Sequence, residues 1–434
     1  MPVSEPDDAA PHDPTETAEL RLEPVHFIAR ADAVLRLGRL MLGAGASSAR
    51  VRDSMKRVAT GLGIDGLHSR VGMTDIVLTA QRGALYRTRV AEVRPAVDAE
   101  RITRLQRLSH RAESGLTLMA LQSELDAIEQ SPPRYPTALR VTAAAAACAA
   151  FALLNNGGWL EALAVGLAVA LGQWLRMRLL RARVNEFFVV FLAAVVALLG
   201  YLALAELAGI AGLAQGGHDA AMTSAVLFLV PGFPLVTGAM DLARLDLNAG
   251  IARVAYAVLV LLTTGTAVWA VAAAFQSSAI LTAPPLFDEP VLSLVRLVAG
   301  FVGVLGFALL FCTPWRIALI ASAIGALVNV GRLLLVDAGI TPPVAAALAG
   351  LAVGAGAFLA VRRLDAPRVT LTVPAVLIMV PGAAAYRAIV ATIDGDTVAA
   401  VQWGVQAVGV VIALAIGLTV ARILTEREWG RSGP

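Results

Sequence analysis

Two Pro-Gly pairs are the residues whose type and spacing most directly suggest a binding site in this sequence of 434 residues. Pro231-Gly232 ends the segment Ala-Val-Leu-Phe-Leu-Val-Pro-Gly, and Pro381-Gly382 ends Ala-Val-Leu-Ile-Met-Val-Pro-Gly 150 residues later. Proline removes a backbone donor and glycine adds no side-chain cover, so each pair predicts a kinked or unwound helix. A half-helix beginning at either glycine presents free N–H groups, which suit the carboxylate of an amino acid or a small dicarboxylate. The alternative is a plain proline kink that binds nothing.

Two charged residues that follow these pairs are further candidates for the site. Asp241, ten residues after Pro231, either binds a substrate amine or carries a coupling proton, or it is a carboxylate paired with Arg244 or Arg253. Arg387, six residues after Pro381, either holds a carboxylate or snorkels to the membrane surface. Uncharged polar residues in apolar segments could line a polar path, although hydrogen bonding between helices is the commoner use of each: Asn155, Asn156, Gln173, Asn329, Gln402 and Gln406.

The Pro-Gly pairs lie in long apolar segments that are typical of membrane-spanning helices. The chain is 58% hydrophobic and 15% charged, with a mean hydropathy of +0.73, whereas a soluble domain is about 25% charged. A helix needs about 20 apolar residues to cross a bilayer. Ten segments qualify, although the first two are separated only by a short polar turn: 137–155, 159–175, 187–207, 220–241, 251–275, 292–311, 316–336, 343–361, 369–391 and 398–421.

The position of the two Pro-Gly segments predicts an internal repeat. Each lies in the fourth helix of a five-helix half, at 137–280 and 291–425. Because five is odd, the halves must enter the membrane in opposite orientations, as in many secondary transporters. The two interrupted helices should then face a shared polar chamber at mid-membrane.

Arginine placement predicts the orientation in the membrane. With the N-terminus inside, 14 of the 17 arginines after residue 136 lie at cytoplasmic helix ends. The positive-inside rule therefore predicts a multi-pass protein of the cell (cytoplasmic) membrane with both termini in the cytoplasm.

The N-terminal part predicts a small α+β domain on the cytoplasmic side. Residues 1–24 are acidic and proline-rich and predict a disordered tail, and residues 426–434 form a cytoplasmic tail. Residues 25–133 predict two amphipathic helices broken near Gly43, a β-hairpin over 72–94, and helices over 98–112 and 117–130. The expected fold is thus an all-α polytopic membrane protein of ten helices in two inverted five-helix repeats, with this α+β domain before it.

The sequence lacks the residue patterns that hydrolysis, metal binding and nucleic-acid binding require. None of the histidines lies in a predicted membrane helix, and no metalloprotease or nucleophile-elbow motif occurs, so we expect no enzyme, metal or cofactor. Cys148 and Cys312 lie in apolar stretches, so we expect both to be small buried residues. No basic run indicates nucleic-acid binding. The partners expected are a small-molecule substrate and membrane lipid, and a homo-oligomer is compatible with the sequence. The five histidines are His12, His26, His68, His110 and His218.

Three motifs resemble the threonine/serine exporter family over residues 30–425. They are Val230-Pro-Gly-Phe-Pro-Leu-Val-Thr-Gly-Ala-Met-Asp241 followed by Gly250-Ile-Ala-Arg253, the N-terminal Gly43-Ala-Gly-Ala-Ser-Ser-Ala-Arg50, and Val380-Pro-Gly-Ala-Ala-Ala-Tyr386-Arg387. The second half is similar to a partner protein that is separate in two-component relatives, so the chain resembles a fused form. The resemblance implies export of L-threonine and L-serine driven by the proton-motive force. Two-component relatives are associated with dicarboxylate export.

Three other functions are left open by the sequence. One is an exporter of dicarboxylates such as succinate, and a second is a passive channel. A third is a membrane-anchored protein whose soluble domain resembles a hydrolase through Asp65, His68, Ser69 and Asp75.

Overall fold

The structure is a computed structural model that describes residues 14–213, 219–275, 288–364 and 366–426. The chain forms two compact units, one of residues 1–95 and 104–131 and one of residues 96–103 and 132–434. Each unit is considered by itself below.

The first unit combines helices with a three-stranded antiparallel sheet. The sheet order is β1-β2-β3, and Arg82 pairs with Leu85 at the turn of the expected hairpin, where Gly83 has a φ of 54°. β1 was not expected, because its burial does not alternate regularly between the two faces. The elements are α1 (Pro14–Gly43), α2 (Ser48–Gly61), β1 (Gly66–Val71), β2 (Asp75–Arg82), β3 (Leu85–Glu92), α3 (Ala99–Glu113), which continues into this unit from the second, and α4 (Leu118–Gln130).

The first helix begins earlier than expected. α1 starts at Pro14, so residues 14–24 are helical and do not belong to a disordered tail. Proline suits the first position of a helix, because its fixed φ is helical and its missing N–H would have no partner there. Residues 1–13 of the expected tail and residues 427–434 of the C-terminal tail lie outside the described residues.

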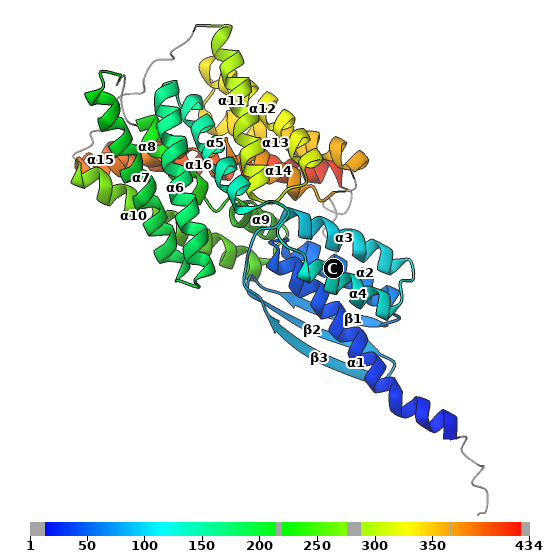
Figure 1. The fold of residues 1–434 in the computed structure, drawn as a ribbon. Coiled ribbons are helices and arrows are strands. Elements are labelled where there is room, and N and C mark those ends of the chain that lie inside the picture. The colour runs from blue at the N-terminus through cyan, green and yellow to red at the C-terminus, as the bar shows by residue number, and fades with distance from the viewer. Residues whose placement is uncertain (1–13, 214–218, 276–287, 365, 427–434) are drawn as a thin grey trace, which may run out of the picture. The chain divides into compact units, whose positions relative to one another are not determined.

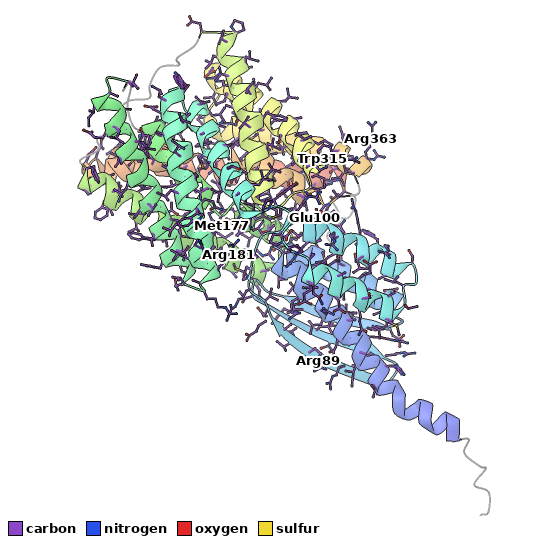
Figure 2. All side chains as sticks on the ribbon, viewed as in Figure 1. Arg89, Glu100, Met177, Arg181, Trp315 and Arg363 are labelled. Carbon is purple, nitrogen blue, oxygen red and sulfur yellow. The ribbon has the colours of Figure 1, made fainter. Side chains whose placement is uncertain are left out.

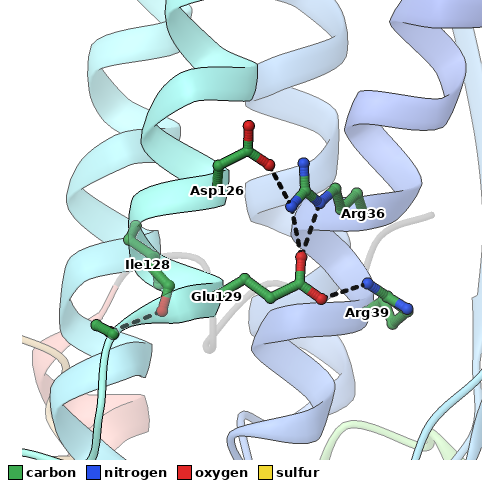
Figure 3. A network of polar contacts seen from close by, with 6 residues as sticks. Arg36, Arg39, Asp126, Ile128 and Glu129 are labelled. Carbon is green, nitrogen blue, oxygen red and sulfur yellow. Dashed lines mark hydrogen bonds and ion pairs between the residues drawn. The ribbon is translucent and has the colours of Figure 1, made fainter.

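A network of charged side chains joins α1 to α4 (Figure 3). Glu129 accepts hydrogen bonds from Arg36 Nε at 3.0 Å and from Arg39 at 2.7 Å, and Arg36 also lies 2.6 Å from Asp126. One carboxylate thus serves two arginines, and the helices are held by a linked set of ion pairs.

We expect Glu129→Ala to lower the stability of this unit by about 1 kcal/mol, because partly exposed ion pairs contribute up to about that much. The measurement is hydrogen exchange of α1 and α4 amides in the full-length protein at low salt. Glu124→Ala is the control, since Glu124 pairs with Arg111 in a single ion pair, and both of these side chains are more exposed than Arg36 and Glu129. Equal exchange in the two variants would contradict the role of the network.

The second unit is a bundle of apolar helices (Figure 1). Among the described residues, eight helices are long and apolar enough to cross a membrane, or up to ten if each of two bent helix pairs is one span. The protein is therefore an all-α polytopic membrane protein in this unit. The eight are α5 (Thr137–Leu154), α6 (Trp159–Arg181), α7 (Glu186–Ile210), α10 (Leu247–Ala274), α11 (Val291–Leu310), α12 (Trp315–Asp337), α13 (Pro342–Leu364) and α16 (Thr397–Thr425).

The two bent pairs coincide with the Pro-Gly segments. The first consists of α8 (Asp219–Ala225) and the 3₁₀ turn η1 (Leu227–Leu229), followed by α9 (Gly232–Ala243). The second consists of α14 (Val369–Leu377), followed by α15 (Gly382–Ile393). A polar turn separates α5 from α6, with Asn156 at a φ of 63°, so these are two helices.

Glycines let neighbouring helices approach closely. A Cβ at Gly306 of α11 would lie 2.4 Å from the carbonyl oxygen of Ala143 on α5, and one at Gly350 of α13 would lie 2.5 Å from that of Leu414 on α16. Side chains do not fit at such distances. Small residues at these crossings allow the backbone contact that packs membrane helices.

Candidate functional site

Both Pro-Gly pairs lie at breaks whose backbone has the same conformation. Pro231 has φ −76° and ψ 62°, and Pro381 has φ −80° and ψ 57°, values typical of an inverse γ-turn. Gly232 donates its N–H to the carbonyl of Val230 and Gly382 donates to that of Val380, both at 2.8 Å. The chain bends by 69° at the first break and by 47° at the second. The predicted interruption is confirmed at both prolines.

The N-terminus of α9 is poor in free donors. The first N–H groups of a helix have no acceptor within the helix, but the γ-turn uses that of Gly232 and Pro234 has none. The next residue, Leu235, already donates to the carbonyl of Pro231 at 3.0 Å. Phe233 is 1% exposed and packs edge-on against Phe311, with ring centroids 5.1 Å apart. This helix end is covered by apolar groups.

The N-terminus of α15 is better suited to an anion. The γ-turn uses the N–H of Gly382, and Ala385 donates to Pro381 at 3.1 Å. Ala383 and Ala384 lie between them, and their N–H groups have no acceptor within the helix. Gly382 and Ala383 are also half-buried rather than buried. The sequence predicted equivalent sites at both breaks, whereas the backbone favours the second.

In each broken span, the helical part before the break is its first arm (α8 with η1, or α14) and the helix after the break is its second arm (α9, or α15). The two spans cross so that each break lies against the first arm of the other span. A Cβ at Gly232 would lie 2.7 Å from Leu377 Cδ1 of α14, and a Cβ at Gly382 would lie 2.8 Å from Thr223 Cγ2 of α8. α9 packs against α14, and α15 packs against α8. A side chain at either glycine would therefore force Leu377 or Thr223, or the arm that carries it, to shift.

A small apolar cavity of about 50 Å³ lies beside the first break. Its 13 lining residues come from α9, from α14 with the second break, and from α16, and all are glycine or apolar. The expected shared polar chamber is therefore wrong for this cavity. The six residues before each proline are apolar in sequence, so polarity at the breaks comes from main-chain groups and from Thr223 of α8, which lies against the second break.

Asp241 forms a buried ion pair with Arg253 of α10. The carboxylate and guanidinium lie 3.3 Å apart, and the two residues are 1% and 4% exposed. Gly238 and Gly250 bring α9 and α10 close together beside this pair. The geometry corresponds to the paired alternative foreseen from the sequence, with Arg253 as the partner.

Arg387 stacks on an aromatic ring away from the second break. Its guanidinium lies 4.9 Å from the ring centroid of Trp403 on α16. Trp403 stands 150 residues after Arg253, so it has the position in α16 that Arg253 has in α10. In both halves, the residue at this position contacts the second arm of the broken span. This contact supports a structural use of Arg387.

Comparison with known families covers nearly the whole chain. The family model described as "Putative threonine/serine exporter" matches residues 32–275, and the one described as "Threonine/Serine exporter, ThrE" matches residues 296–424. The chain belongs to the threonine/serine exporter family. No solved structure matches it.

Individual relatives of this exporter-family chain have two kinds of name. A "Threonine/serine exporter" of Corynebacterium glutamicum is 25% identical over 90% of this chain and 80% of its own length. Two proteins named "Probable succinate transporter subunit YjjP" match about half of this chain. The one from Klebsiella aerogenes is 32% identical over 52% of this chain and 85% of itself, and the one from Escherichia coli is 31% identical over 53% and 88%.

The first unit of this exporter-family chain does not bring the hydrolase residues considered from the sequence together. His68 and Ser69 are consecutive in β1, so their side chains point to opposite faces of the sheet. Asp65 accepts the N–H of Gly83 at 2.8 Å and thereby holds a turn. In the described part of the chain, no three His, Cys, Asp or Glu residues are grouped so that they could hold a metal ion.

Two residues of the candidate site were missed by sequence reasoning. Thr223 and Leu377 each lie against the glycine of the opposite break. Both precede their own proline within an ordinary apolar stretch, and nothing in their spacing shows that the spans cross. Only the packing of one half against the other identifies them.

Proposed function

We propose that this chain is a secondary active exporter of L-threonine and L-serine, coupled to the proton-motive force, and that its two five-helix sets are inverted repeats. The observation that carries the proposal is the reciprocal crossing of two breaks that share the same turn at their prolines. Each break frees main-chain groups in a helix bundle, which is tolerated only where protein or a ligand satisfies them. Inverted pairs of broken helices are the usual binding sites of secondary transporters.

The substrate carboxylate binds at the N-terminus of α15. The N–H groups of Ala383 and Ala384 and the positive end of the helix dipole attract an anion there. Gly382 leaves room for close approach, while the apolar cavity beside Gly232 accepts the uncharged part of a small amino acid. Movement of the short arms about the two γ-turns then exposes this site to one side of the membrane at a time.

The N-terminal unit and both termini face the cytoplasm in this proposal. Arg181 at the end of α6 and Arg363 at the end of α13 are exposed (Figure 2). The positive-inside rule assigns both ends to the cytoplasmic face, and the even number of ten spans brings the C-terminus back to the same side.

A dicarboxylate is the second candidate, because two relatives are named as succinate transporter subunits. A dicarboxylate needs a second cluster of donors or a cation. The cavity beside the first break has no charged lining residue, and an unpaired carboxylate against apolar walls is strongly unfavourable. This arrangement favours the amino acid.

Flux from liposomes tests the function. The purified full-length protein is reconstituted with labelled L-threonine, L-serine or succinate inside, and efflux is measured with and without an imposed proton gradient. We expect gradient-stimulated efflux of threonine and serine and little efflux of succinate. Efflux that ignores the gradient would indicate a passive channel, and efflux of succinate alone would establish the second candidate.

A further inference from the structure

Two buried amide side chains occupy equivalent helices in the two halves of the membrane unit. Gln173 lies on α6 and Asn329 on α12, 156 residues later, and both are 0% exposed. α6 and α12 are each 23 residues long and begin with tryptophan. Each amide also stands three residues before an arginine, Arg176 or Arg332. The pattern amide-x-x-Arg therefore recurs at the same place in both helices.

The hydrogen-bonding capacity of these amides is largely unused. Among the described residues, neither Gln173 Oε1 nor Gln173 Nε2 has a hydrogen-bond partner. Asn329 Oδ1 accepts from Arg332 Nε at 3.0 Å, but Asn329 Nδ2 has no acceptor in that part of the chain. Burying a polar group without a partner is costly, so each such case in a native protein calls for an explanation.

The neighbours of both amides lie against the first arms of the broken spans. A Cβ at Gly172, next to Gln173, would lie 3.2 Å from the ring of Phe228 in η1. A Cβ at Gly325, one turn before Asn329, would lie 3.0 Å from the backbone of Ala375 in α14. α6 and α12 therefore cover the arms that lead into the two breaks.

The alternation of the spans gives the direction of this packing. Consecutive spans cross a membrane in opposite directions, so α12 and α14, which are two spans apart, run in the same direction. Asn329 is one turn beyond Gly325 and therefore lies further toward the second break than the contact with Ala375. Gln173 follows Gly172, which meets the ring of Phe228 three residues before Pro231.

We propose that Gln173 and Asn329 are the polar side chains that bind the transported molecule at the two breaks. This inference rests on the exporter function proposed above. No group in the described part of the chain satisfies these amide atoms, so the partner is a molecule that enters the site. Asn329 keeps only donors, which suit the carboxylate at the N-terminus of α15. Gln173 keeps a donor and an acceptor, which suit an ammonium or hydroxyl group.

The pair therefore selects a hydroxyl-bearing α-amino acid over a dicarboxylate. A dicarboxylate has no donor at neutral pH, so Gln173 Nε2 could donate to its second carboxylate but Gln173 Oε1 would stay without a donor. A site built for a donor rejects a ligand that lacks it, because its own polar group is left unpaired.

Gln173→Leu tests the proposal in reconstituted full-length protein. We expect threonine efflux to fall by about tenfold or more, as the loss of a hydrogen bond to a charged group predicts. The melting temperature without ligand should stay equal or rise, because an unpaired amide is removed, and the rise in melting temperature caused by threonine should disappear. Gln406→Leu is the matched control, since Gln406 on α16 is only half-buried, and it should retain both efflux and the threonine effect.

Asn329→Asp provides an independent test, because it keeps the acceptor for Arg332 and replaces the donor by a negatively charged acceptor, which repels a carboxylate. It should abolish efflux and the threonine-induced shift. Unchanged efflux and shift in both variants, with an active wild type, would overturn this inference and leave the exporter function intact. A lower melting temperature of Gln173→Leu and of the similarly shaped Gln173→Met would also overturn it, because it would show that the amide holds the fold. An inactive wild type would refute the exporter function itself.

Discussion

Gly382→Ala is expected to reduce threonine efflux by about tenfold, because overpacking a tight contact costs about 1–3 kcal/mol. The new Cβ would lie 2.8 Å from Thr223 Cγ2, so the Thr223 side chain must turn against its preferred rotamer, or the second break and α8 must move apart. The second of these movements displaces the donors of α15 from the crossing. Efflux from reconstituted liposomes is the measurement, with the amount of folded protein determined by gel filtration.

A compensating substitution makes this prediction specific. Thr223→Ser removes the methyl group that the new Cβ would meet and keeps the hydroxyl group. The double variant Gly382→Ala, Thr223→Ser should therefore recover much of the lost efflux. Gly404→Ala is the control, because no atom lies within 4 Å of a Cβ at Gly404. Failure of the double variant to recover, or an equal loss in Gly404→Ala, would argue against close approach as the role of Gly382.

Asp241→Asn is expected to destabilise the protein by about 3–5 kcal/mol, because it leaves the charge of Arg253 buried without its ion-pair partner. Transport should be lost together with stability, since the ion pair holds α10 against α9, the helix that follows the first break. Thermal unfolding in detergent and efflux are measured on the same preparation. The double variant Asp241→Asn, Arg253→Gln should be more stable than Asp241→Asn alone, because no charge is then left buried.

The same substitution separates the two uses of Asp241 considered from the sequence. Asp394→Asn serves as the control, because Asp394 is exposed at the end of α15, and its stability should match the wild type. A stable Asp241→Asn variant whose efflux no longer responds to the proton gradient would contradict the structural role. It would assign the coupling proton to Asp241.

The sequence by itself determined the membrane spans and the place of both interruptions. Each span follows from an apolar length that water does not tolerate, and each interruption follows from a proline that cannot donate its helical hydrogen bond. These are local properties, so the boundaries of α5 to α7 and α11 to α13 lie close to those expected. The family resemblance carried by the Pro-Gly motifs was likewise confirmed.

Only the tertiary structure decided what surrounds the breaks. Whether Asp241 meets Arg244 or Arg253, whether a cavity is polar, and which glycine touches which arm all depend on contacts between residues far apart in the chain. Pro234, which has no N–H group, makes the N-terminus of α9 poorer in donors than that of α15. This difference matters because the γ-turns already use the N–H groups of both glycines. Buried amides such as Gln173 look like ordinary helix-packing residues in a sequence, because the partner that they lack is a three-dimensional property.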